Sequence, residues 1–190
     1  MKIIKAIFSG SSQNVTGKPA KKLPEFAFIG RSNVGKSSLI NALCKQGKLA
    51  HTSSTPGKTQ LVNHFLINDS WYLVDLPGYG YAKISKTDRE KLAAINQNYI
   101  NESEELRVQK IDLQFLTELG EAEVPFAIIY TKCDKQGTFS LNERVENNNK
   151  ILLEYWEVLP PVFLTSAETG KGREEILDYI GSIIDKKTIQ

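Results

Sequence analysis

Residues 30–37 form a pattern that can bind phosphate groups. They read Gly-Arg-Ser-Asn-Val-Gly-Lys-Ser, the complete phosphate-loop pattern G-x-x-x-x-G-K-[ST]. Backbone N–H groups of such a loop turn inward around phosphate oxygens, and the N-terminus of the following helix adds to the anion site. We expect Lys36 to reach the β- and γ-phosphates and the Ser37 hydroxyl to ligate Mg²⁺. The candidate nucleotide-binding residues here are Gly30, Arg31, Ser32, Asn33, Val34, Gly35, Lys36, Ser37 and Ser38.

A second candidate motif is an acidic strand end 39 residues after Lys36. The sequence Asp75-Leu76-Pro77-Gly78 closes an apolar run that starts at Trp71. A carboxylate there can hold Mg²⁺ through a water molecule, and the Gly78 N–H can sense a γ-phosphate. Asp75 is therefore a candidate metal ligand and Gly78 a candidate catalytic residue, while Leu76 and Pro77 complete the nucleotide-binding set.

A polar loop at residues 52–60 lies between these two motifs. It reads Thr-Ser-Ser-Thr-Pro-Gly-Lys-Thr-Gln. Such a loop suits a switch that closes over Mg²⁺ only when a γ-phosphate is present. Thr59 is the favoured metal ligand and a candidate catalytic residue, with Thr55 as the fallback. Pro56, Gly57 and Lys58 are further candidate binding residues.

Two later segments point to guanine as the base. Thr131-Lys132-Cys133-Asp134 follows an apolar run. The Asp134 carboxylate can accept from N1 and the N2 amine of guanine, whereas adenine offers no such donor pair. The Lys132 stem can lie over the base. After the next strand, Thr165-Ser166-Ala167 can bring a backbone N–H to the guanine O6. A salt-bridged loop after a strand is the alternative interpretation of Thr131–Asp134.

Short apolar runs alternate with helical patterns, which favours an α/β fold with a mostly parallel sheet and helices on both faces. Expected strands are Glu25–Gly30, Asn63–Ile67, Trp71–Leu76, Pro125–Thr131 and Val162–Ser166. Expected helices are Lys36–Lys45, Lys86–Ile100, Ile111–Leu119, Leu141–Trp156 and Arg173–Asp185. The strand, loop and helix around Lys36 make phosphate binding a better interpretation than a turn that binds nothing. Residues 1–24 are expected to be an irregular or edge-strand lead-in to a core at 25–185.

Length and composition favour one globular domain without a membrane span. The chain has 190 residues, 41% hydrophobic and 24% charged, and a net charge of +2. Cys44 and Cys133 have no metal-ligand or disulfide spacing and are expected to be buried. The first residues are too short and too charged a run for a signal peptide. A reduced, cytoplasmic, monomeric enzyme is the expectation.

These motifs resemble the bacterial EngB family (also known as YsxC or YihA). The likeness covers most of the chain and rests on the phosphate loop with Asn41, on Thr55–Gln60, and on the specific run Pro77-Gly78-Tyr79-Gly80-Tyr81-Ala82-Lys83. It implies a P-loop NTPase fold of the Ras-like G-domain type, at residues 1–190. It also implies GTP and Mg²⁺ as ligands, a role in assembly of the large ribosomal subunit, and a link to cell division and septation.

Two residues bear on the rate of hydrolysis. Tyr79 follows Gly78 at the position where Ras-like enzymes place the glutamine that orients the attacking water. A phenol cannot do this, so we expect slow hydrolysis assisted by a partner or an ion. Asn33 resembles the asparagine that holds K⁺ against the phosphates in related GTPases; a turn residue bonding its own backbone is the alternative.

One stretch departs from the family pattern. Family members have an apolar central strand before the helix that starts near Ile111, but residues 98–112 contain no run of Val, Ile or Leu. We expect about a dozen residues to be absent near Leu106–Val108 and the central strand to be missing. Residues omitted from the chain, a natural or engineered deletion, and a rearranged five-stranded sheet with Pro125–Tyr130 beside Glu25–Gly30 are the three explanations.

The leading hypothesis for function is a slow GTPase switch that acts on a precursor of the large ribosomal subunit. Basic residues near the switch segments, Lys58, Lys83 and Lys86, are candidates for contact with RNA. The alternative is a guanine-nucleotide-binding scaffold without meaningful turnover. A P-loop kinase is disfavoured, because Thr131–Asp134 and the Pro-Gly-Tyr-Gly turn have no use there.

Overall fold

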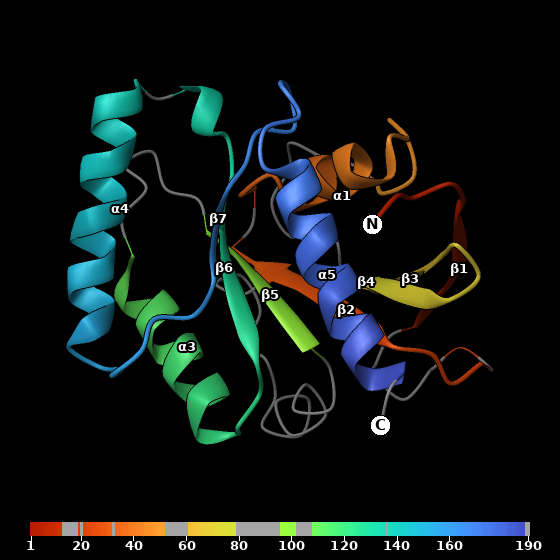
Figure 1. The fold of residues 1–190 in the computed structure, drawn as a ribbon, viewed down its shortest axis with the longest axis horizontal. Helices are drawn as coiled ribbons and strands as arrows, with labels where there is room; N and C mark the ends of the chain where they lie inside the picture. Colours follow the sequence, from red (N-terminus) through yellow and green to blue (C-terminus); the bar gives the residue numbers. More distant parts are fainter. Residues whose placement is uncertain are drawn as a thin grey trace.

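A seven-stranded sheet forms the centre of the described structure, which is a computed structural model. It describes residues 1–12, 19, 21–31, 33–51, 61–78, 96–101, 108–135 and 137–188, with backbone alone at 96–101, 187 and 188. The strand order is β1-β3-β4-β2-β5-β6-β7 (Figure 1). The elements are β1 (Ala6–Ser12), β2 (Glu25–Gly30), α1 (Lys36–Cys44), β3 (Val62–Ile67), β4 (Trp71–Asp75), β5 (Asn96–Asn101), α3 (Lys110–Glu121), β6 (Phe126–Tyr130), the short 3₁₀ turn η1 (Cys133–Lys135), α4 (Thr138–Leu153), β7 (Val162–Leu164) and α5 (Arg173–Thr188).

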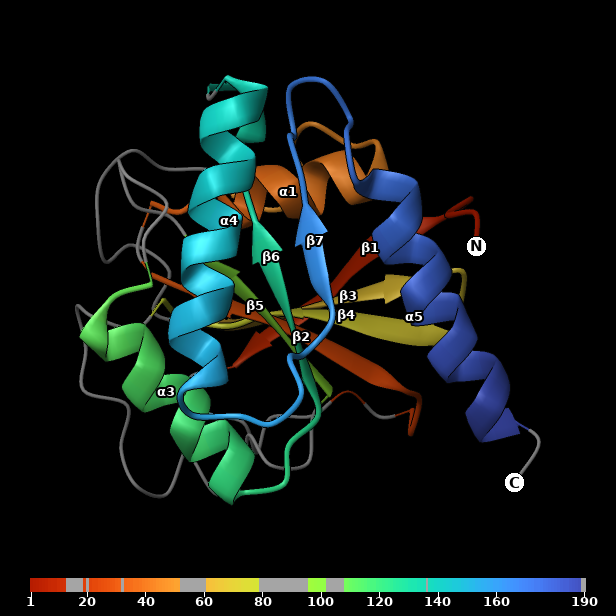
Figure 2. The ribbon, with the colours of Figure 1, turned by 60° about the vertical axis from the view of Figure 1, so that its left-hand side comes forward.

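Helices cover both faces of the sheet. Figures 1 and 2 place α3 and α4 together on one side and α1 and α5 together on the other. Two apolar clusters fill the layers between. Alternate side chains of β2 serve both: Ala27 and Ile29 pack toward α3 and α4, and Phe26 and Phe28 pack toward α1 and α5. The strand that leads into the phosphate loop is therefore held from both faces.

A hairpin and the N-terminal strand complete one edge of the sheet. Among the described strands, β3 alone runs against the others, because it pairs antiparallel with both β1 and β4. Asn68 and Asp69 turn the chain between β3 and β4 with φ of 50° and 56°, left-handed values that Asn and Asp tolerate well. The Asn68 amide oxygen accepts from the backbone of Ile4 and Lys5 (2.8 and 3.1 Å), which holds the chain start to the hairpin.

Most expected elements are confirmed, with ends shifted by a few residues. The strands β2, β3, β4, β6 and β7 and the helices α1, α3, α4 and α5 lie where the apolar patterns placed them. The apolar stripe of α5 packs into the core, with Ile176, Leu177 and Ile180 buried. Cys44 and Cys133 are buried free thiols, as expected. Residues 6–12 form the edge strand β1, which is one of the two alternatives expected for the lead-in at residues 1–24.

The expectation of a missing central strand is wrong. Residues 96–101, whose sequence is Asn-Gln-Asn-Tyr-Ile-Asn, form β5 between β2 and β6, in parallel register with both. The expected helix over residues 86–100 is therefore also wrong at its C-terminal end, and its first ten residues lie outside the described part. A five-stranded sheet with β6 beside β2 is excluded, because β5 separates them. Backbone pairing explains this: without β5, the facing N–H and C=O groups of β2 and β6 would lack partners.

No helix in the part of the chain that the structure describes is both long and apolar enough to cross a membrane.

Candidate functional site

The phosphate loop joins β2 to α1 at the carboxyl end of the sheet. Gly30 is buried at the end of β2, and Lys36 and Ser37 open α1. The loop turns through left-handed residues, Asn33 with φ 66° and Gly35 with φ 92°. Gly35 is the N-cap of α1 and has no side chain to occupy the first-turn N–H groups. These N–H groups and the positive end of the helix dipole can therefore act on an anion.

Lys36 and Asp75 form a buried ion pair across the site. The Lys36 amine contacts Oδ1 of Asp75, and the two side chains are 8% and 2% exposed. Parallel pairing of β2 and β4 sets Asp75 beside Phe28, and the Leu76 N–H continues the pairing to the Phe28 carbonyl at 3.0 Å. Burial lowers the pKa of Lys36 to about 7, whereas the adjacent carboxylate favours its charged form. The two candidate residues for phosphate and metal thus lie in contact.

The candidate guanine motif is bonded to the phosphate loop. The Thr131 hydroxyl donates to the Val34 carbonyl, and the Lys132 amine donates to the Asn33 carbonyl at 3.1 Å. Burial is the largest cause of a lowered pKa at Lys132. Asp134 lies in η1 with an exposed side chain. Residues nearly a hundred positions apart are therefore joined directly, with an exposed carboxylate at the far side of the contact.

The third candidate base-binding segment follows β7 and packs beside η1. The Cys133 N–H donates to the Thr165 carbonyl at 3.0 Å, and the Thr165 N–H and hydroxyl donate to the Tyr130 carbonyl at 2.7 and 3.0 Å. Ser166 is buried and Ala167 is exposed. A Cβ on Gly172, whose φ is 76°, would lie 2.3 Å from the Leu164 carbonyl oxygen. Only glycine fits there without a shift, so the loop closes tightly against β7.

The structure describes most of the predicted site residues. Leu76, Pro77 and Gly78 continue from β4 next to the phosphate loop strand, and Ser38 lies exposed on α1. The remaining candidates lie outside the described residues: Ser32, Thr55, Pro56, Gly57, Lys58, Thr59, Tyr79, Lys83 and Lys86.

Two residues that support α1 were not predicted. The Arg173 guanidinium, on a side chain that is largely buried, donates to the Ala42 and Leu43 carbonyls at the end of α1. A cation at this end can bond the last carbonyls of the helix and suits the helix dipole. Asn41 is buried and bonds both the N–H and the carbonyl of Ala50 at 2.7 and 3.0 Å. A polar residue inside an apolar helical stripe was the available signal for Asn41; nothing local indicated Arg173.

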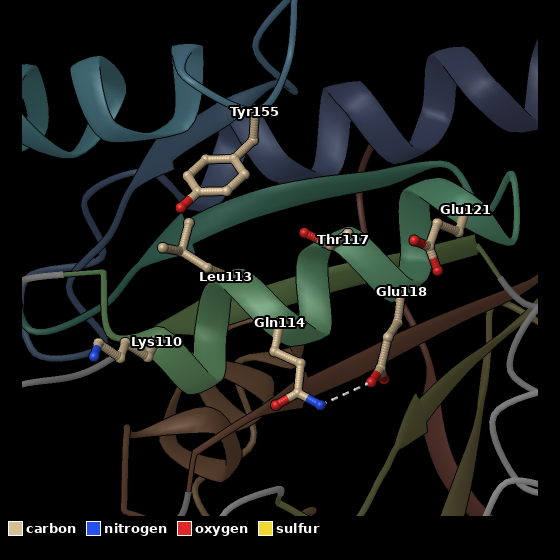
Figure 3. A pocket seen from close by; sticks show the side chains of 7 residues that line it. All are labelled: Lys110, Leu113, Gln114, Thr117, Glu118, Glu121 and Tyr155. Carbon is tan, nitrogen blue, oxygen red and sulfur yellow. Dashed lines mark hydrogen bonds between the residues drawn. The ribbon is translucent and has the colours of Figure 1, made fainter.

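A hollow elsewhere on the surface is separate from these residues. It measures about 460 Å³ and lies along the outer face of α3, closed on one side by Tyr155. Figure 3 shows the Tyr155 ring leaning toward Leu113, and the Gln114 amide donating to Glu118 at 3.2 Å. Its mixture of charged and apolar side chains contains none of the predicted nucleotide-binding residues.

Comparison with known proteins agrees with this geometry. A family model described as a 50S ribosome-binding GTPase matches residues 25–132. The chain is 55% identical to the probable GTP-binding protein EngB of Porphyromonas gingivalis, over 96% of both chains. It is also 55% identical to that of Phocaeicola vulgatus, over 96% of this chain and 97% of the relative. The crystal structure of a probable GTP-binding protein engB superposes with a TM-score of 0.61 at 23% identity, covering 85% of this chain and 99% of the other.

The same comparisons bear on the length of the chain. The alignments with both relatives span 194 positions, of which 96% of 190 residues, or about 182, come from this chain. About a dozen residues of these relatives therefore have no counterpart inside the matched region. The fold is that of a P-loop GTPase G domain. By sequence and by fold, the chain belongs to the EngB family of GTP-binding proteins.

Proposed function

We propose that this protein is a slow, Mg²⁺-dependent GTPase that acts as a switch in assembly of the large ribosomal subunit. The observation that carries the proposal is the bonding of Thr131 and Lys132 to the carbonyls of Val34 and Asn33. This contact joins the base-reading motif and the phosphate loop into a single site. A nucleotide bound there spans both parts.

Asp134 selects the base. Its exposed carboxylate accepts from N1 and N2 of guanine, while adenine would leave it unpaired. Lys132 holds its stem between the phosphate loop and the base, and Thr131 fixes the loop. Thr165, Ser166 and Ala167 line the opposite side, where a backbone N–H reaches the guanine O6.

Lys36 and Asp75 act on the phosphates and on Mg²⁺. In the structure these two residues pair with each other. Asp75 supplies the negative charge that a bound phosphate would bring to Lys36, and Lys36 supplies the positive charge that Mg²⁺ would bring to Asp75. Lys36 turns to the β- and γ-phosphates, and Asp75, Ser37 and Thr59 are the residues that would hold Mg²⁺. The buried carboxylate of Asp75 fits a hard cation that takes its other ligands from phosphate and water. When bound, Mg²⁺ neutralises charge on the phosphates.

Hydrolysis is slow and requires a partner or an ion to accelerate it. Tyr79 cannot orient water as a glutamine does, so Lys36, Thr59 and the Gly78 N–H stabilise the transferring phosphoryl group without a positioned base. We propose that Asn33 holds K⁺ against the phosphates; its left-handed backbone also fits a plain turn residue. Turnover is expected to be several-fold faster in KCl than in NaCl at equal ionic strength, and equal rates would remove K⁺ from the account.

The partner is a precursor of the large ribosomal subunit, made of ribosomal RNA and proteins. The description of the matching family model supports this partner. Lys58, Lys83 and Lys86 contact RNA, so association with ribosomal particles should weaken as salt rises. Insensitivity to salt would favour a protein docking site instead. A cytoplasmic location, and the link to cell division and septation, follow from this partner and from the family resemblance.

The test is a multiple-turnover phosphate-release assay with purified protein, GTP and Mg²⁺, with and without large ribosomal subunits. The proposal expects slow release alone and faster release with subunits. Lys36→Met is the control, because it removes the phosphate-binding amine. GTP binding without release above the Lys36→Met background, under both conditions, would establish the alternative, a guanine-nucleotide-binding scaffold.

A further inference from the structure

A buried ion pair ties the phosphate loop to the start of α3. Nε of Arg31, the second residue of the loop, lies 3.4 Å from Oδ1 of Asp112, and the two side chains are 13% and 0% exposed. Burying a charge is costly unless it is paired and hydrogen-bonded. Arg31 is a candidate nucleotide-binding residue only as a member of the phosphate loop, and Asp112 is not a candidate, so the burial of this pair requires an explanation of its own.

Asp112 also fixes the helix to which it belongs. Its second oxygen, Oδ2, accepts from the Gln109 N–H at 2.8 Å, while the Gln109 side chain accepts from the Asp112 N–H, which completes a capping box. A single carboxylate thus caps α3 and holds Arg31. A movement of the first turn of α3 would therefore displace the Arg31 side chain of the phosphate loop.

A second tether fixes the same turn to the strand that carries the guanine motif. Asn148 of α4, 1% exposed, accepts from the Val108 N–H at 3.0 Å and donates to the Tyr130 hydroxyl at 3.1 Å. Tyr130 immediately precedes Thr131. Burial is the main cause that raises its pKa to about 12, so the hydroxyl keeps its proton and its hydrogen bonding at any working pH. The start of α3 is therefore linked to the phosphate loop through Asp112 and to the strand before the guanine motif through Asn148.

The phosphate loop is held from two sides. Thr131 and Lys132 bond its carbonyls at Val34 and Asn33, and Asp112 holds its Arg31 side chain. The loop turns twice through the left-handed region, at Asn33 and Gly35; Asn and Gly both tolerate this conformation, so the shape of the loop depends on the contacts that hold it. Removing one of the two supports should let the loop relax and misplace its N–H groups.

We infer that Arg31 and Asp112 are a positioning pair that sets nucleotide affinity by fixing the phosphate loop against α3, without either side chain having to contact the nucleotide. The inference rests on the proposed function, since it assigns a role within the same site. By linkage, a nucleotide bound to the loop must stabilise the first turn of α3 to the same extent.

A double-mutant cycle tests the pair. The variants are Arg31→Gln, Asp112→Asn and both together, and the readout is the Kd of a fluorescent GDP. Asp112→Asn keeps an acceptor for the Gln109 N–H while removing the charge. Each single change is expected to weaken binding about tenfold, and the double change also about tenfold rather than a hundredfold. Arg31→Lys, which keeps the charge, should recover part of the loss.

Controls separate positioning from mere stability. Asp69→Asn breaks the exposed Lys5–Asp69 pair, and Ile180→Val loosens the core near α5, so both should leave the Kd unchanged. A hundredfold loss in the double variant would overturn the inference, because Arg31 would then act on the nucleotide itself. So would an unchanged Kd in the single variants, or Arg31→Lys binding no better than Arg31→Gln.

The unmodified protein supplies a second test if the variants do not fold. Hydrogen exchange of the amides of residues 108–113 should slow when GDP is added, and unchanged exchange in a sample that binds GDP would contradict the inference. If the unmodified protein binds no GDP at all, the proposed function has failed instead.

Discussion

Two neighbouring strands at the centre of the sheet, β2 and β5, differ strongly in their amino-acid composition. Five of the six β2 residues are buried, and its apolar side chains alternate between the two cores. The adjacent β5 reads Asn-Gln-Asn-Tyr-Ile-Asn, with four amide residues in six. Asn is a residue type that strands disfavour, and buried parallel strands are normally runs of Val, Ile and Leu.

This difference shows that the flanking strands, rather than its own amino-acid composition, can make a segment a strand of the sheet. Phe28 of β2, Asn98 of β5 and Ala127 of β6 share one register line. The backbones on both sides of β5 require a partner, whatever side chains it brings. β2 is a strand by its own sequence, whereas β5 is a strand because two others flank it.

The length of this chain, compared with that of its relatives, also bears on the contrast between β2 and β5. About a dozen residues of the relatives have no counterpart within the matched region. The sequence predicts this shortfall near Leu106–Val108, where an apolar run was expected. We infer that β5 fills a place for which the relatives have more chain available.

The largest expected effect is on β2. Phe28 is fully buried, so Phe28→Ala should lower the free energy of unfolding by about 3–5 kcal/mol, through lost burial and a cavity. Chemical denaturation measures this loss. The matched control is Phe139→Ala, because Phe139 is 85% exposed and should cost little. Similar losses for both variants would mean that β2 is not the packed centre of the domain.

A proline at the same register line tests whether β5 is a paired strand. Asn98→Pro removes a ladder N–H and should cost about 3 kcal/mol more than Asn98→Ala, which keeps it. Unfolding in urea would compare the two variants. If they unfold at the same midpoint, residues 96–101 do not pair with β2 and β6.

The smallest effect should be a gain. Asn98→Val replaces a residue type that strands disfavour by one that they favour, and should raise the free energy of unfolding by about 0.5–1 kcal/mol over Asn98→Ala. The same urea titrations measure it. A loss of stability instead would show that the amide at residue 98 is required, and would remove the contrast with β2.

The accuracy of the sequence-based predictions also differs between segments such as β2, whose own sequence specifies their structure, and segments such as β5, whose neighbours specify it. The glycines, Lys36, Asp75 and Thr131–Asp134 could be placed because short motifs carry their own local geometry, and β2 because its apolar run permits one environment. The strand at 96–101 could not, since its residues favour loops and only tertiary pairing makes it a strand. The Arg31–Asp112 pair and the Arg173 cap join distant segments, so no local pattern predicts them, although Gln109 and Asp112 have capping-box spacing.

The most direct test of the account is competition for a fluorescent GDP bound to the purified, unmodified protein in the presence of Mg²⁺. GTP should displace the probe and ATP should not, and Asp134→Ala should lose this preference because the carboxylate that reads guanine is gone. Equal displacement by ATP would contradict the guanine site. A folded protein that binds no probe would show that the polar strand β5 does not support a working phosphate loop.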